Sequence, residues 1–217
     1  MSNSAKMSAR QRIEALVDAN SFVEIGGLVT KRNTDFNMRE KAVPADGVIT
    51  GYGVIDSELV YVYSQDVTAL NGSIGEMHAK KIVRLYEMAM KAGAPVVGLI
   101  DCAGVRVQEA VDALAGFGEL YLSKVKASGV IPQISAILGS CGGGVAISSL
   151  LSDFTLMDTQ NGKLFVNSPN AVDGNNTDKC DTAAAAFQAE AGNVDFLCDT
   201  EADVLAQIRS LVQILPA

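Results

Sequence analysis

The chain has 217 residues, of which 48% are hydrophobic and 19% are charged, and its net charge is −8 at pH 7. This length suits one domain with a sizeable core, and we expect residues 1–217 to form a single domain. The acidic balance argues against nucleic acid or an anionic membrane surface as the main partner. No run of about 18 apolar residues predicts a membrane span, and the polar N-terminus has no apolar signal core, so we expect a cytoplasmic protein.

The spacing of the cysteines and the number of histidines exclude some metal sites and catalytic mechanisms. Cys102, Cys141, Cys180 and Cys198 lie too far apart for a zinc-binding C-x-x-C pattern, so we expect reduced thiols and no metal site. His78 is the only histidine, which excludes mechanisms that need two imidazoles.

Hydrophobic periodicity predicts alternating strands and helices along the chain. Ser8 is a candidate helix cap, and the polar residues 31–46 predict a loop that is mobile or contacts a partner. The first predicted elements are a helix over 9–18, a strand over 22–29, a hairpin of strands 48–55 and 59–63, and a helix over 72–91.

The remaining elements continue the alternation. They are a strand over 96–100, a helix over 107–127, a strand over 131–138 followed by a small-residue helix, short strands over 154–157 and 164–166, and helices over 182–191 and 201–215. Strands that are separated by helices favour parallel pairing, so the fold class is α/β.

The most informative stretch follows the strand predicted over 131–138 and reads Gly139-Ser-Cys-Gly-Gly-Gly144. Glycines have no side chain between their backbone N–H groups and a ligand. The first N–H groups of the next helix point to the same place, with the positive end of the helix dipole behind them. Such a corner suits a developing negative charge, for example on a thioester oxygen that becomes an enolate. A tight turn alone explains one glycine better than three in a row.

Another corner, the first of the two along the chain, is Asp101-Cys-Ala-Gly-Val-Arg-Val-Gln108, and it follows the strand predicted over 96–100. Both corners come at the C-terminal ends of predicted parallel strands, where ligands bind in open α/β sheets. On the preceding helix, Lys80, Lys81 and Arg84 form either a solvated face or a group of positive charges that attracts phosphates.

Five motifs in this order resemble the acyl-CoA carboxyltransferase family: Asp46-Gly-Val-Ile-Thr-Gly-Tyr-Gly53, Gly72-Ser-Ile-Gly-Glu-Met-His-Ala-Lys-Lys81, Ala103-Gly-Val-Arg-Val-Gln-Glu109, Gly129-Val-Ile-Pro-Gln-Ile-Ser135 and Gly139-Ser-Cys-Gly-Gly-Gly144. This family includes carboxyltransferase subunits of biotin-dependent propionyl-CoA and acetyl-CoA carboxylases. It also includes related subunits of glutaconyl-CoA and methylmalonyl-CoA decarboxylases. The resemblance covers nearly the whole chain and implies a crotonase-like fold built of ββα units.

The resemblance implies that this chain is the acyl-CoA-binding half of a biotin-dependent carboxyltransferase, because it matches only the N-terminal half of the family. The reaction moves CO₂ between carboxybiotin and the α-carbon of a short-chain acyl-CoA. The implied cofactor is biotin on a carrier protein, and the substrate is a CoA thioester. The implied partners are a C-terminal-half carboxyltransferase subunit and the biotin carrier protein, in a homo- or hetero-oligomer that reaches a membrane only through partner subunits.

Carried over residue by residue, Gly143 and Gly144 fall where the family's backbone amides hold the acyl thioester oxygen, so they are the implied catalytic residues. The implied substrate-binding residues are Ala103, Gly104, Val105, Arg106, Gly142 and Lys80. The ureido nitrogen of biotin serves as the base in this chemistry, so no side-chain nucleophile is required.

Departures from the family pattern leave the acyl group open. The chain has Cys102-Ala-Gly-Val-Arg106 where the family usually has Ser-Gly-Gly-Ala-Arg, and Ile147 where a Tyr is usual. Two other interpretations also stay open: a scaffold half-subunit that has lost catalysis, and a hydrolase that uses Cys141 in a nucleophile elbow. Such a hydrolase has its histidine after the nucleophile, whereas His78 precedes Cys141. The residues do not choose between a carboxylase and a decarboxylase.

Overall fold

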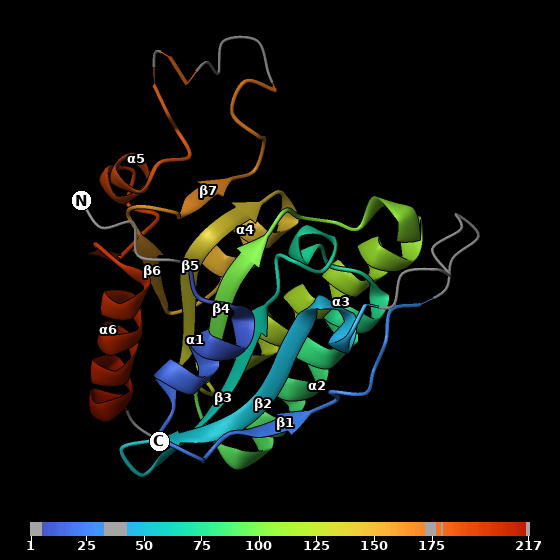
Figure 1. Ribbon diagram of the computed structural model, residues 1–217, viewed down its shortest axis with the longest axis vertical. Helices are drawn as coiled ribbons and strands as arrows, with labels where there is room; N and C mark the ends of the chain where they lie inside the picture. Colours follow the sequence, from blue (N-terminus) through green and yellow to red (C-terminus); the bar gives the residue numbers. More distant parts are fainter. Residues whose placement is uncertain (1–5, 33–42, 172–176, 179, 216–217) are drawn as a thin grey trace.

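A single mixed sheet lies in the middle of the molecule, with helices on both faces (Figure 1). The computed structural model describes residues 6–32, 43–171, 177–178 and 180–215. The helices are α1 (Ala9–Leu16), α2 (Glu76–Ala92), α3 (Ala110–Ala127), α4 (Gly144–Leu150), α5 (Ala185–Glu190) and α6 (Glu201–Ile214). The strands are β1 (Val23–Ile25), β2 (Val48–Ile55), β3 (Glu58–Gln65), β4 (Val96–Cys102), β5 (Gln133–Gly142), β6 (Phe154–Asp158), β7 (Lys163–Phe165) and β8 (Phe196–Cys198). Short 3₁₀ segments are η2 (Ala45–Gly47), η3 (Leu70–Gly72) and η4 (Val107–Glu109).

The strand order is β1-β2-β3-β4-β5-β6-β8, and β7 pairs with β5. β1, β2 and β3 are antiparallel, as a hairpin requires. From β3 onward every pairing is parallel, which confirms the expectation from alternating strands and helices. Parallel strands end at one edge of a sheet, so β4 and β5 deliver their following loops to the same side.

The sheet separates two apolar cores because successive side chains of a strand point to opposite faces. In β4, Val96 and Ile100 belong to the core under α2 and α3. Val97 and Leu99 belong to the other core, which α1 and α6 cover. The central strands are thus buried on both faces, the arrangement expected of a parallel sheet with helices on either side.

Helix starts differ from the sequence prediction where loops prepare the site. Ser8 caps α1 as expected, and Gln11 completes a capping box. α2 begins at Glu76 rather than at residue 72, and α3 begins at Ala110 rather than at residue 107. Both helices are preceded by short segments that pair with each other through Ile74 and Val105. This long-range pairing replaces the first helical turn that periodicity predicted for each helix.

β5 is longer than predicted and runs into the glycine-rich corner. Its first part pairs with β6, and the residues from Ser140 to Gly142 pair with β7. The sequence suggested a loop here because glycines weaken strands. The backbone hydrogen bonds offered by β7, which lies more than 20 residues further along, could not be read from the local pattern. β8 was missed for the same reason, since three residues beside β6 carry no periodic signal.

The other predicted elements are present with shifted ends, and the helix over 182–191 is the shorter α5. Most of the predicted loop over 31–46 lies outside the described residues. In the part of the chain that the structure describes, no helix is long and apolar enough to cross a bilayer.

Candidate functional site

The two glycine corners meet at the C-terminal edge of the sheet. Cys102 at the end of β4 pairs with Cys141 near the end of β5. Beyond them, a Cβ built on Gly104 would lie 3.3 Å from the Gly142 carbonyl oxygen, and one built on Gly142 would lie 3.2 Å from the Ala103 carbonyl oxygen. The structure therefore brings Ala103, Gly104 and Gly142 together, as the expectation of a shared site requires.

Gly143 is the residue that turns the chain from β5 into α4. Its φ of 62° and ψ of −131° lie in a region that only glycine adopts readily. A Cβ at this position would meet nothing within 4 Å, so the Cα faces open space. Its N–H, however, donates to the Phe165 carbonyl at 2.9 Å. The N–H that was expected to face a thioester oxygen is thus engaged by β7 in this structure.

The other glycines of the corner allow close packing. A Cβ on Gly139 would overlap the Asp101 carboxylate, and one on Gly142 would come 2.8 Å from the Phe165 ring. A Cβ on Gly144 would lie 2.7 Å from the Tyr121 hydroxyl oxygen, which itself donates to the Gly144 carbonyl at 2.7 Å. Gly144 is the first residue of α4, so its N–H has no acceptor within the helix.

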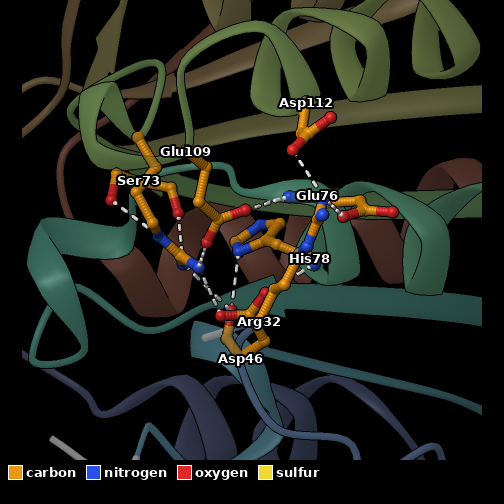
Figure 2. A network of polar contacts seen from close by, with 8 residues as sticks. Arg32, Asp46, Ser73, Glu76, His78, Glu109 and Asp112 are labelled. Atoms are coloured by element: carbon orange, nitrogen blue, oxygen red, sulfur yellow. Dashed lines mark hydrogen bonds and ion pairs between the residues drawn. The ribbon is translucent and has the colours of Figure 1, made fainter. Parts of the chain in front are cut away.

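A buried ion cluster lies behind the first corner. The Arg106 guanidinium is paired with Asp46 and with Glu109, and the side chains of all three are fully buried. Arg106 also donates to the Ser73 carbonyl at 2.8 Å. Figure 2 shows Asp46, Ser73 and Glu109 facing one another across this cluster. Burial raises the pKa of the Asp46 carboxyl, although the Arg106 charge acts in the opposite direction.

His78 is packed into the same cluster and is not accessible (Figure 2). Its Nδ1 lies 3.0 Å from the Asp46 carbonyl oxygen, and its Nε2 lies 3.2 Å from the Gln65 amide nitrogen. A carbonyl only accepts and an NH₂ group only donates, so the imidazole is neutral with its proton on Nδ1. Burial, with Arg106 and Lys81 nearby, lowers the pKa of His78 to about 3.

The structure places the Arg106 side chain away from solvent. Its guanidinium, expected to bind substrate, is enclosed by Asp46, Glu109 and Ser73 and has no exposed surface to offer to a CoA phosphate. Val105, in contrast, is partly exposed between the corner and η4. The segment from Ala103 to Val105 thus borders the site with its backbone, while the Arg106 side chain lies behind it.

Lys80 is on the exposed face of α2, where its ammonium group donates to Glu76 at 2.6 Å. Arg32 binds the same Glu76 and also Asp112, as Figure 2 shows. The Glu76 contact raises the pKa of Lys80. The Lys80 ammonium group is thus already paired with a carboxylate that Arg32 shares.

Lys81 has a different role from Lys80. It is buried and donates to the carbonyls of Ala45 and Val48. Burial lowers the pKa of Lys81 to about 8. The two adjacent lysines therefore divide between a solvated face and a structural contact, which the sequence left open.

The cysteine interpretation of the corner finds no support in the geometry. Cys141 is buried, its sulfur lies 3.3 Å from the Ser149 hydroxyl, and burial raises the pKa of the thiol to about 12. A thiolate nucleophile needs the opposite shift. All four cysteines are free thiols in the structure, as expected.

A cavity of about 590 Å³ lies at the other end of the sheet. Its lining includes Leu59, Ala94, Pro132 and Phe154, which stand at or just before the starts of β3, β4, β5 and β6. The glycine corners follow the opposite ends of these strands, so this cavity is not part of the candidate site.

Sequence reasoning missed Asp46, Ser73 and Glu109 as members of the site's framework. Each lies inside a motif quoted for the family resemblance, but the residues are far apart in the sequence. A glutamate three residues after Arg106 is a signal for an ion pair. Nothing local indicates that Asp46 completes the cluster.

Comparison with known proteins identifies the family of this fold. The family described as the carboxyl transferase domain matches residues 2–217. The alpha subunit of methylmalonyl-CoA decarboxylase from Veillonella parvula is 46% identical over 98% of this chain and 42% of its own length. The propionyl-CoA carboxylase beta chain from Roseobacter denitrificans is 41% identical over 97% of this chain and 42% of its own length.

Comparison with solved structures supports the same family. Transcarboxylase 12S, a hexamer with hydrolysed methylmalonyl-CoA bound, superposes with a TM-score of 0.93 at 36% identity, over 97% of this chain and 42% of that chain. A Pseudomonas malonate decarboxylase hetero-tetramer gives a TM-score of 0.83 at 25% identity, over 97% of this chain and 84% of that chain. The crotonase-like fold expected from the motifs is thereby confirmed. The chain spans about two fifths of the length of the curated relatives it matches, and it belongs to the carboxyl transferase domain family.

Proposed function

We propose that this chain is the acyl-CoA-binding half of a biotin-dependent carboxyltransferase. It moves CO₂ between carboxybiotin and the α-carbon of a short-chain acyl-CoA, within a carboxylase or a decarboxylase. The observation that carries the proposal is the superposition on transcarboxylase 12S, whose structures contain methylmalonyl-CoA or its hydrolysis product, over 97% of this chain. The two relatives named above act on methylmalonyl-CoA and propionyl-CoA by name, which supports a small acyl group.

The backbone of the two corners is the proposed oxyanion pocket. The Gly104 N–H makes only a 3.3 Å contact with the Cys102 sulfur, a weak acceptor. The Gly144 N–H stands at the start of α4 without a helical acceptor. Because the Gly143 N–H is donated to Phe165, we assign the donor role to Gly144 and Gly104. Gly143 contributes the open Cα face beside which the acyl group lies.

The side chains near the corners fit a reaction in which the protein supplies no base. His78 is buried and neutral, with a pKa of about 3, and the pKa of the Cys141 thiol is raised to about 12. Neither group is poised for proton transfer at neutral pH. Biotin, carried on a partner protein, supplies the carboxyl group and, through its ureido nitrogen, the base. The task of this chain is then to bind the thioester and stabilise charge on its oxygen.

An exposed apolar face supports a partner for this half. Exposed apolar side chains recur at helical spacing along η4 and α3, and two of them, Val111 and Leu114, are 73% and 60% exposed. The full set is Val107, Val111, Leu114, Leu122 and Val125. Ile147 and Leu150 continue the apolar surface on α4, which contacts α3. Contiguous apolar patches of this kind mark interaction sites. We propose that a domain equivalent to the C-terminal part of the relatives covers this face, from the same or another polypeptide.

The experiment measures transfer of labelled carboxyl from methylmalonyl-CoA to free biotin, with the protein combined with that C-terminal half. The wild type is expected to transfer, and the purified 217-residue chain alone to bind the CoA ester weakly without transfer. Gly143→Ala places a methyl group on the open face and should lower the rate about 100-fold, the cost of a displacement of about 1 Å. Cys141→Ala should retain most activity.

Gly93→Ala is the matched control for backbone strain. Gly93 caps α2 with a φ of 71° and open space around its Cα, far from the corners. It should lose less stability than Gly143→Ala, because its ψ of 19° lies in the left-handed helical region, and it should keep its transfer rate. A wild-type protein that never transfers with its complementary half would overturn the proposed function in favour of a scaffold. Loss of activity in Cys141→Ala, with Gly143→Ala active, would favour the hydrolase.

A further inference from the structure

The buried cluster of Asp46, Arg106 and Glu109 has no part in the chemistry proposed above, yet it lies directly behind the first corner. The corner itself is bound to the segment before α2 by three backbone hydrogen bonds. Ala103 N–H donates to Asn71, Ile74 N–H donates to Gly104, and Arg106 N–H donates to Ile74, at 2.9 to 3.1 Å. The segments 71–74 and 103–106 therefore move as one unit.

Side chains then fasten this unit to the body of the protein. The Arg106 guanidinium donates to the Ser73 carbonyl at 2.8 Å, to Glu109 at 2.8 Å and to the Asp46 carboxylate. Asp46 also accepts the His78 N–H of α2 at 2.8 Å. Arg106 is thus the one side chain among these that touches both segments of the unit and the η2 segment below them.

Glu109 extends the connection to the start of α2. Its second carboxylate oxygen accepts the Glu76 N–H at 2.6 Å, and the N-cap residue Gly75 has no side chain to do so. One guanidinium therefore links the loop before α3, the loop before α2 and η2. Its fixed, planar donors suit several acceptors at defined angles, which a lysine ammonium does not reproduce.

We propose that Arg106 is a positioning residue that sets the place of Gly104 against Gly142 and Gly144, through the clamp formed with Asp46 and Glu109. This inference rests on the proposed function for its effect on rate, because a displaced Gly104 N–H no longer meets the thioester oxygen. It replaces the expectation that Arg106 binds CoA directly. If Arg106 binds CoA, its replacement should raise KM. If Arg106 is a clamp, its replacement should lower kcat.

The experiment compares Arg106→Lys with Arg209→Lys in the protein combined with its C-terminal half. Arg209 also serves several acceptors, namely the Leu16 carbonyl, Asp18 and Asp56, but at the hairpin end of the sheet. With methylmalonyl-CoA, Arg106→Lys should lower kcat about 10- to 100-fold and leave KM within about threefold, since geometry and not binding is lost. Arg209→Lys should change neither constant. A raised KM with unchanged kcat in Arg106→Lys would show a CoA ligand and overturn the clamp.

A second readout does not depend on activity. Hydrogen exchange of the backbone amides in residues 71–76 and 102–106 should be at least tenfold faster in Arg106→Lys than in wild type, and unchanged in Arg209→Lys. If Arg106→Lys does not fold, Glu109→Gln takes its place, because it keeps the size of the side chain but leaves one acceptor oxygen for two donors, the Arg106 guanidinium and the Glu76 N–H. If both segments of Arg106→Lys exchange at the wild-type rate, the clamp is overturned. If the wild-type protein itself is inactive, only the proposed function is overturned.

Discussion

His78 illustrates how one buried side chain couples acid stability to the site. Its Nε2 accepts from the Gln65 amide, and the Gln65 amide oxygen in turn accepts the Asp101 N–H at 3.3 Å. Protonation would place an N–H against the Gln65 NH₂ group. Rotation of that amide would relieve the repulsion but break the contact to Asp101, which is the first residue of the first corner.

The stability of the protein should therefore fall in mild acid. The His78 pKa is about 3 in the folded state and 6.5 ordinarily, so the unfolded chain binds the extra proton between these values. The stability that neutral His78 contributes is fully present above pH 6.5 and is lost as the pH falls toward 3. The loss is up to about 1.4 kcal/mol per pH unit. Urea unfolding followed by circular dichroism from pH 7 to 4.5 measures the slope.

His78→Asn is the matched variant, because its amide N–H can replace Nδ1–H as the donor to the Asp46 carbonyl. It should lower stability at pH 7 but show a smaller loss from pH 7 to 4.5 than wild type. Equal slopes in the two proteins would mean that other groups, such as carboxylates, account for the acid sensitivity.

At the scale of elements, α1 is the helix whose start the sequence fixes by itself. The Ser8 hydroxyl accepts the Gln11 N–H at 3.3 Å, and the Ser8 N–H donates to the Gln11 side chain at 2.9 Å. Replacing such a cap with alanine costs about 1 kcal/mol. Ser8→Ala should therefore lower the free energy of unfolding by about this amount in chemical denaturation.

Ser210→Ala provides the control for that prediction. The Ser210 hydroxyl donates to the Ala206 carbonyl within α6 and is exposed, so its removal should change stability by less than about 0.5 kcal/mol. If both variants are equally stable, the capping box contributes nothing measurable to this protein.

At the scale of the whole molecule, α3 and α4 carry an exposed apolar face. Obligate interfaces typically bury about 2,000 Å² or more. The apolar residues on this face would form part of the proposed interface with the C-terminal half. Leu114→Glu combined with Leu122→Glu should abolish assembly with the C-terminal half and leave the fold unchanged. Light scattering and circular dichroism measure the two properties.

Arg84→Glu is the control for adding negative charge, because Arg84 lies on the exposed polar face of α2 beside Glu87. It should assemble like wild type. A stable wild-type monomer, both alone and with the C-terminal half, would contradict the proposed interface.

The sequence by itself determined the family and the parallel α/β sheet, and it predicted a candidate site at two glycine corners. These features depend on local signals: the periodicity of apolar residues, the glycine runs and the order of the motifs. The Ser8 cap also belongs here, because its partner Gln11 is only three residues away.

Only the tertiary structure decided which contacts each corner residue makes. The extension of β5 to Gly142 depends on β7, and the same pairing lets Phe165 take the Gly143 N–H. Arg106, which the resemblance implied to be a substrate-binding residue, is enclosed in a buried ion cluster because Asp46, 60 positions earlier, meets it in space. Hydrogen bonds and ion pairs between distant residues depend on three-dimensional packing, and a pattern along the chain contains no record of which partners the fold brings together.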